Sequence, residues 1–165
     1  MPRINPKDLP PQYRKQIEEQ TRTPGFVKAF NAPIVKPDGV IVARLEPMGK
    51  PRMTRRDKWA KRDCVVRYHA FADELRRQVQ HLLPPDVAEL SWTAYFTMPE
   101  SWSQKKKAQH AGQPHRAKPD RDNIDKAILD ALFEQDSGIA TGTLCKRWDD
   151  GLGARIVIVA KSFSG

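Results

Sequence analysis

The sequence has few of the features that direct a chain to a membrane or to an oxidising compartment. It contains only two cysteines in 165 residues, Cys64 and Cys145, which are too few for a disulfide framework. Its longest aliphatic runs, residues 39–43 and 156–160, are far too short to span a bilayer. Its first residues show no apolar segment of the kind found in signal peptides. We therefore expect a cytoplasmic protein with reduced thiols and no membrane partner.

Several common catalytic arrangements are also missing. The sequence contains no glycine-rich phosphate loop and no Ser, Cys or Thr in a recognisable nucleophile context. Its four histidines have no ligand spacing to one another or to the cysteines. We therefore assign no chemistry to these residues and expect no small-molecule cofactor.

Acidic residues are outnumbered by basic ones. The chain has 29 Lys and Arg against 20 Asp and Glu, a formal net charge of +9, and such an excess favours polyanionic partners. Many of the cations fall in two basic clusters, which are candidate phosphate contacts unless they are simply a solvated surface. The first cluster comprises Lys50, Arg52, Arg55, Arg56, Lys58, Lys61 and Arg62, and the second comprises Lys105, Lys106, Lys107 and Lys118.

A tryptophan lies in or beside each basic cluster, Trp59 in the first and Trp102 next to the second. An aromatic side chain among cations can stack on an unpaired base of a nucleic acid. Ordinary packing residues would equally suit both positions, and the sequence leaves the two interpretations open.

Hydrophobic periodicity predicts helices and strands interspersed after residue 38. The basic stretch 50–66 has no sustained period and is expected to be a loop, and Ser101 is placed to cap a short helix that carries the lysines of the second cluster. Strands are expected at 40–45, 90–98 and 154–160, and longer helices at 68–82 and 123–134. This order predicts an α+β domain with a small mixed β-sheet flanked by helices.

Residues 1–38 differ in character from the rest of the chain. A short helix is expected between residues 8 and 20, followed by a segment punctuated by proline and glycine. We interpret residues 1–38 as a helical arm or linker ahead of one domain at 39–165.

The strongest local signal is an acidic motif at residues 118–132, Lys-Pro-Asp-Arg-Asp-Asn-Ile-Asp-Lys-Ala-Ile-Leu-Asp-Ala-Leu. If Asp120 is extended, it points to the same side as Asp122, because side chains alternate along an extended chain. On the helix that follows, positions 122, 126 and 130 form one polar row, while Ile124, Ile128 and Leu132 turn towards the core. A second acidic pair, Asp149 and Asp150, follows after a loop.

Carboxylates that converge on one spot repel one another unless a cation lies between them. Oxygen ligands without clustered Cys or His indicate Mg²⁺ or Mn²⁺ rather than zinc. A metal ion that binds the scissile phosphate, while basic residues bind the flanking phosphates of a nucleic acid, would explain a cluster of acids within a basic protein. The alternative is helix capping, in which Asp122 or Asn123 stabilises the start of the helix.

The acidic motif together with Asp149-Asp150 resembles the signature of RusA-type Holliday-junction resolvases. Two upstream segments, Gly49-Lys50-Pro51-Arg52 and Met98-Pro99-x-Ser101-Trp102, also resemble those of phage and prophage members. The resemblance covers about residues 40 to 160.

This resemblance implies a homodimer that uses Mg²⁺ or Mn²⁺ at two active sites to place paired nicks in four-way junction DNA. Carried over by motif position, it implies Asp120, Asp122 and Asp150 as metal ligands. Lys126 would be the essential basic residue beside them, and Asp130 and Asp149 would be secondary acids.

Two departures from the family pattern bear on these assignments. The stretch between Asp130 and Asp149 is longer than in the family, so either it is an inserted loop or the match at Asp149-Asp150 is less secure in register than the first motif. A last strand of the family also has no counterpart, so one edge of the sheet is expected to be open or covered by the N-terminal segment.

Two other functions remain open. A catalytically silent protein that binds branched DNA would share the fold and the basic surface, and it would need no Mg²⁺. A nuclease for flaps or structured RNA would share the chemistry and differ only in its substrate.

Overall fold

The structure is a computed structural model that describes residues 34–35, 39–59 and 62–162. The chain divides between residues 32 and 33, and all of the described residues belong to the second unit. The helix expected at 8–20 lies outside the described residues, and the domain boundary placed at residue 38 stays a prediction.

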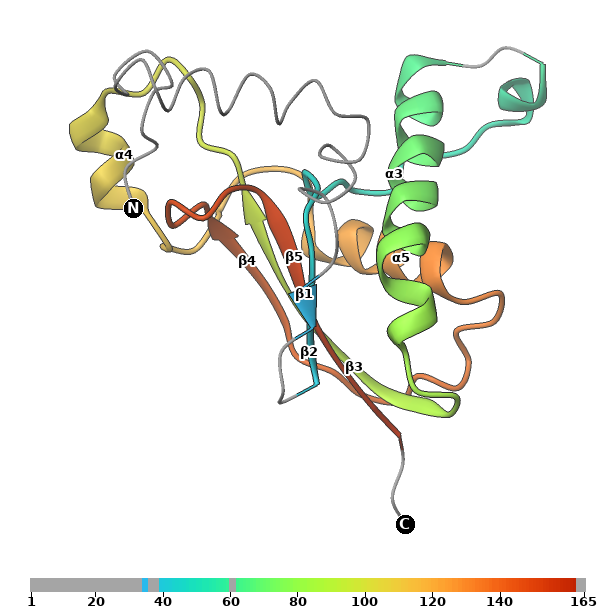
Figure 1. The fold of residues 1–165 in the computed structure, drawn as a ribbon. Coiled ribbons are helices and arrows are strands. Elements are labelled where there is room, and N and C mark those ends of the chain that lie inside the picture. The colour runs from blue at the N-terminus through green and yellow to red at the C-terminus, as the bar shows by residue number, and fades with distance from the viewer. Residues whose placement is uncertain (1–33, 36–38, 60–61, 163–165) are drawn as a thin grey trace, which may run out of the picture. The chain divides into compact units, whose positions relative to one another are not determined.

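Five strands form one mixed sheet with the order β1-β2-β5-β3-β4 (Figure 1). All neighbouring strands pair antiparallel except β3 and β4, which are parallel. The strands are β1 (Ile34–Val35), β2 (Val40–Ala43), β3 (Val87–Phe96), β4 (Leu144–Trp148) and β5 (Arg155–Ser162). The mixed sheet confirms the predicted α+β class. Strand β1, from the range assigned to the arm, covers the edge of β2.

Strand β4 was not predicted. It lies inside the stretch that was longer than the family pattern, and it pairs with β3 in register from Trp92 opposite Leu144 to Phe96 opposite Trp148. Only Trp148 of its residues is buried and the other four are half-buried, so the strand shows neither an apolar run nor clear alternation. The interpretation of this stretch as an inserted loop is therefore wrong for residues 144–148.

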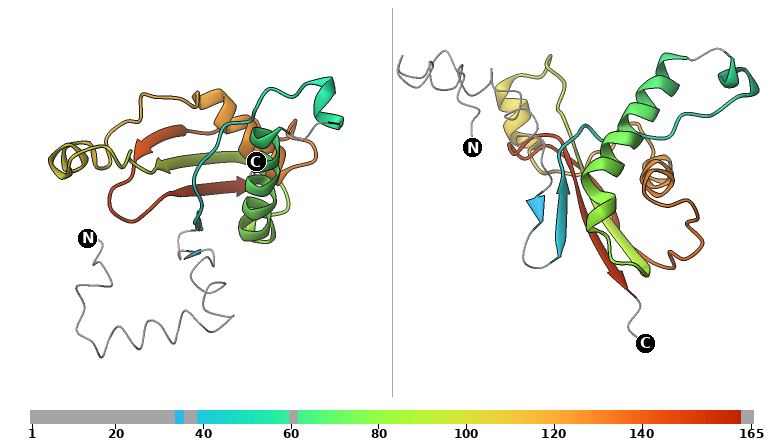
Figure 2. Two further views of the ribbon diagram at one scale, coloured as in Figure 1. Left: turned by 90° about the horizontal axis from the view of Figure 1, so that it is seen from above. Right: turned by 45° about the vertical axis from the view of Figure 1, so that its right-hand side comes forward.

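Three α-helices accompany the sheet: α3 (Asp63–Val79), α4 (Gln104–His110) and α5 (Arg121–Leu132). Two short 3-10 turns, η2 (Arg55–Lys58) and η3 (Gln80–Leu82), flank α3. Helices α3 and α5 lie side by side against the sheet, whereas α4 lies at the far end of the strands (Figure 2). Within the described part of the chain, no helix is both long and apolar enough to cross a bilayer.

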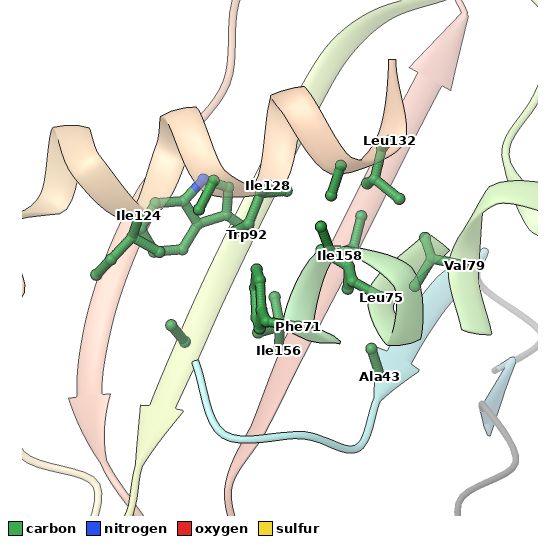
Figure 3. Packing of buried hydrophobic residues seen from close by; sticks show 14 of the residues in the cluster. Ala43, Phe71, Leu75, Val79, Trp92, Ile124, Ile128, Leu132, Ile156 and Ile158 are labelled. Atoms are coloured by element: carbon green, nitrogen blue, oxygen red, sulfur yellow. The ribbon is translucent and has the colours of Figure 1, made fainter. Parts of the chain in front are cut away.

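The core lies between α3, α5 and the sheet (Figure 3). Helix α5 contributes Ile124 and Ile128, which are fully buried, and β3 contributes Trp92, which is 1% exposed. Each such side chain stabilises the fold by roughly 1.5–3 kcal/mol through burial. The polar row on the opposite side of α5, at positions 122, 126 and 130, is exposed as predicted.

Three helix starts differ from the predictions. Helix α3 begins at Asp63, where an ion pair with Arg67 at 2.9 Å supports an extra polar turn. Helix α4 is capped by Ser103 and not by Ser101, since the Ser103 hydroxyl accepts a hydrogen bond from the Lys106 amide at 3.3 Å. The N-cap of α5 is Asp120, not Asp122 or Asn123.

The backbone approaches closely where the segment before β4 passes β3. The Leu90 amide bonds to the Thr141 carbonyl at 3.0 Å, and a Cβ on Gly142 would lie 2.0 Å from the Leu90 carbonyl oxygen. We expect Gly142→Ala to destabilise the fold by about 1–3 kcal/mol, as overpacking does, in urea unfolding. Gly138→Ala is the matched control, because the nearest atom to its Cβ would be 4.0 Å away. Equal stability of the two variants would contradict the close approach.

Candidate active site

A pocket of about 660 Å³ opens beside the exposed face of α5. Three separate segments form its wall: the chain after β2, helix α5, and the loop that follows α5. The lining residues are Lys50, Pro51, Arg52, Met53, Asn123, Lys126, Asp130 and Asp136. The pocket therefore combines cations with carboxylates.

The segment at Gly49 and Lys50 is fastened to α5. The Lys50 amide donates to the Asn123 carbonyl at 2.9 Å, and a Cβ on Gly49 would lie 2.8 Å from Cβ of Pro119, so only glycine allows this approach. The Lys50 ammonium bonds to the Asp130 carboxylate. This hydrogen bond raises the pKa of Lys50 above its ordinary value. Lys50 thus spans α5 from its first turn to its last.

Asp120 and Asp122 lie at the start of α5 and are both exposed. Asp120 has an extended backbone, with φ −70° and ψ 148°, and its side chain makes no capping hydrogen bond. Its carboxylate is therefore not occupied by capping, although Asp120 holds the N-cap position. Two exposed carboxylates two residues apart have the chemistry of ligands for a hard divalent cation.

The segment that leads to Asp120 is tied to β4 by Lys146. The Lys146 ammonium donates to the carbonyl of Ala117 at 2.7 Å and to that of Pro119 at 2.8 Å. Backbone hydrogen bonds from the His115 amide to the Lys146 carbonyl and from the Trp148 amide to the Gln113 carbonyl continue this attachment. We call residues 113–119 the strap. Sequence reasoning missed Lys146, because a single lysine in an unpredicted strand carries no signal.

Asp149 and Asp150 shape the turn between β4 and β5. Oδ1 of Asp149 accepts hydrogen bonds from the amides of Gly151 and Gly153, at 3.1 and 2.9 Å. Both oxygens of Asp150 accept from the Arg155 guanidinium, at 2.9 and 2.8 Å. Arg155 holds the pKa of Asp150 below its usual value, and it also lies 3.7 Å over the ring of Tyr95.

The structure brings some of the predicted residues together and separates others. Lys126 and Asp130 line the pocket, and with them lies Asp136, which the sequence analysis did not single out. Asp120, Asp122 and Asp150 do not line this pocket. The sequence carries no motif that marks Asp136, which lies in the long stretch between Asp130 and Asp149. Among the described residues, no three or more His, Cys, Asp or Glu side chains are grouped closely enough to hold a metal ion, and the set Asp120, Asp122 and Asp150 stays a prediction.

Comparison with known proteins identifies the family. The model of the family described as endodeoxyribonuclease RusA matches residues 44–159. The chain belongs to the RusA endodeoxyribonuclease family. No curated protein and no solved structure matches the chain. The matched range contains the pocket, the strap and both acidic segments, and membership implies an endonuclease that acts on branched DNA, the Holliday junction.

In this RusA-family chain, some cations of the first basic cluster form ion pairs within the protein and others are exposed to solvent. Arg62 donates to both oxygens of Asp57, at 2.6 and 2.8 Å, so it is engaged, as Lys50 is with Asp130. Arg52, Arg55 and Arg56 are exposed. Lys61 and the side chain of Lys58 lie outside the described part. All of them stay predictions as DNA contacts.

The second basic cluster lies on α4 and the strap. Lys105 and Lys118 are exposed and Lys107 is half-buried, while the Lys106 ammonium lies 4.2 Å over the ring of Trp102. Trp102 packs against Trp148, with their ring centroids 4.9 Å apart. The structure therefore gives Trp102 a packing role.

One residue of the strap gives the fold a dependence on pH. His115 is 5% exposed and stacks on Phe96, with ring centroids 4.3 Å apart, and its Nδ1 has no hydrogen-bond partner. Burial, together with the charge of Lys146, lowers the pKa of His115. Because the unfolded chain then takes up a proton more readily than the folded chain, stability falls as the pH drops through about 6.5, the ordinary histidine pKa.

We expect His115→Gln to reduce the loss of thermal stability between pH 8 and pH 5, measured as the shift in Tm. His81→Gln, at an exposed position of η3, is the control and should follow the native protein. An unchanged pH profile in the His115 variant would show that this ring does not control acid stability.

Proposed function

We propose that this protein is a Mg²⁺- or Mn²⁺-dependent endonuclease that resolves four-way DNA junctions by paired nicks, acting as a homodimer in the cytoplasm. The observation that carries the proposal is the pair of exposed carboxylates, Asp120 and Asp122, at the start of α5, the helix whose Asn123 and Lys126 line the pocket. It occurs in a chain of an endodeoxyribonuclease family.

Asp120 and Asp122 are the residues that would hold the metal. When bound, the ion would polarise the scissile phosphate and supply an activated water. Lys126 lies one helical turn after Asp122 on the same face, and its ammonium can stabilise negative charge that develops on the phosphate. Asp130, in the last turn of α5, forms an ion pair with Lys50, so the two charges offset each other in that part of the pocket.

Two acids are candidates for a third ligand. Asp150, the candidate from the resemblance, would have to release two charge-assisted hydrogen bonds from Arg155, a side chain only 9% exposed. Asp136 is exposed and lines the pocket together with Lys126. Asp136 could bind a cation without releasing an ion pair with a mostly buried guanidinium, but Asp120 and Asp122 do not line its pocket. Both acids therefore remain candidates for the third ligand.

The homodimer follows from the symmetry of the reaction. A four-way junction has two equivalent strands that must be cut, and a two-fold dimer presents two identical sites at a fixed separation. Exposed cations such as Arg52, Arg55 and Lys118 would hold the backbone of the arms, so affinity should fall as salt rises. Selectivity would then come from the shape of the junction.

The first test is cleavage of a labelled synthetic four-way junction by Asp122→Asn. We expect paired nicks from the native protein in Mg²⁺ and none in EDTA. The variant should lose about a hundredfold or more of the cleavage rate, the scale seen when one group stabilising the transition state is removed. Its junction affinity should stay within a few-fold of native. A protein that binds the junction but never cuts it in Mg²⁺ or Mn²⁺ would be a binding module, and cleavage of flaps or RNA instead would change the substrate.

A second pair of variants separates the candidate third ligands. If Asp136 is the third ligand, Asp136→Asn should lower the cleavage rate about as far as Asp122→Asn, and it should raise the Mg²⁺ concentration needed for half-maximal activity. In that case Asp150→Asn should chiefly lower the melting temperature, because it removes the nearest carboxylate from the mostly buried Arg155 guanidinium, which keeps only Asp149 at 3.8 Å and the Gly153 carbonyl. If instead Asp150→Asn abolishes cleavage in a normally folded protein and Asp136→Asn does not, Asp150 is the ligand.

A further inference from the structure

Trp59 is an exception among the large apolar side chains of the described chain. It is 91% exposed, more than Leu152 at 69%, Val66 at 47% and Met53 at 40%. Indole is the largest side chain, and burying it contributes strongly to stability in a core or an interface. The other three tryptophans, at positions 92, 102 and 148, are buried or half-buried. The exposure of Trp59 therefore indicates that its indole packs against a binding partner.

The turn that carries Trp59 is braced and does not depend on Trp59 for its shape. Asp57 accepts hydrogen bonds from the Thr54 amide at 2.6 Å and from the Arg62 guanidinium at both oxygens. Arg62 also donates to the Arg52 carbonyl at 2.7 Å, and the Trp59 amide donates to the Arg56 carbonyl at 3.0 Å. The indole is thus presented from a fixed turn, which reduces the ordering cost of binding through it.

The turn lies next to the pocket and projects from the body of the domain. Arg52 and Met53, which precede the turn, line the pocket. In Figures 1 and 2, η2 lies at the periphery beyond the start of α3, in every view away from the sheet. Arg55 and Arg56 on the same turn are exposed. An aromatic ring beside free guanidinium groups is the combination that binds an unpaired base together with its phosphates.

We propose that Trp59 stacks on an unpaired base at the branch point of the DNA, while Arg55 and Arg56 contact the flanking phosphates. The proposal rests on the proposed function for its substrate class and adds the residue that engages the branch point. Charge argues against a second copy of this chain as the occupant, because two such cationic turns repel each other, whereas DNA attracts them. Trp102, which also lies near cations, does not share this role because its ring is packed on Trp148.

The test uses the full-length protein in EDTA, so that no cleavage occurs. The probe is a four-way junction with 2-aminopurine at the branch point, compared with the same base placed inside an arm. We expect the native protein to change the fluorescence of the branch-point probe only. Trp59→Ala should lose this change and bind the junction about 5- to 150-fold more weakly, the range for loss of one stacked base. Trp59→Phe should keep most of both.

Three controls make the result specific. Leu152→Ala removes another exposed apolar side chain, on the turn between β4 and β5, and should bind as the native protein does. Trp59→Ala should keep the native melting temperature and the native salt dependence of binding. Arg55→Ala should instead reduce the slope of affinity against salt, because a phosphate contact is lost.

The outcomes also separate this proposal from the proposed function. Loss of the fluorescence change in Trp59→Ala supports base stacking, whether or not the native protein cuts the junction once Mg²⁺ is added. Native-like affinity and fluorescence in Trp59→Ala would overturn it, even for an active resolvase. Weaker binding caused by dissociation of a dimer, detected by sedimentation, would overturn it as well and make Trp59 a subunit contact.

Discussion

The arrangement of this protein depends on the burial of one face of α5 against β3 and α3. Ile124 and Ile128 are fully buried there, beside Trp92, whose indole nitrogen donates to Asp125 of the same helix at 2.8 Å. That contact fixes the rotation of the helix about its axis as well as its distance from the sheet. Because apolar residues recur every fourth position, the row at 122, 126 and 130 must then face solvent. The functional face of α5 is the opposite side of a core helix.

A second set of contacts fixes what lies before that helix. Lys146 holds the strap through the carbonyls of Ala117 and Pro119, and Gly49 allows close approach to Pro119. Because the Lys146 ammonium bonds to two carbonyls, it holds the strap in place without forming an ion pair with an acid near the site. Asp120 is thereby left with an exposed carboxylate at a defined place. Strand β4 and the chain after β2, which are distant in sequence, both determine the geometry at the start of α5.

The acidic pairs illustrate how similar local sequences take different roles. Asp120 and Asp122 are separated by one residue at a helix start and stay exposed, whereas Asp149 and Asp150 are bonded to the amides and the guanidinium of their own turn. Asp136 shows no motif around it, yet it lines the pocket. Backbone amides of a nearby turn can bond an aspartate and so compete with a metal ion for its carboxylate. Asp149 accepts hydrogen bonds from such amides, and Asp150 is bonded to the Arg155 guanidinium.

Periodicity alone determined the α+β class, both long helices, strands β2, β3 and β5, and the exposed row on α5, because each is a property of residues within a few positions of one another. Tertiary structure decided the rest. Strand β4 owes its existence to pairing with β3, which no local pattern records. The partners of Lys146 and Lys50 lie on elements that only folding brings together. Likewise, Trp59 and Trp102 stand in similar basic sequence, but Trp102 is half-buried because it packs against Trp148, whereas Trp59 is exposed.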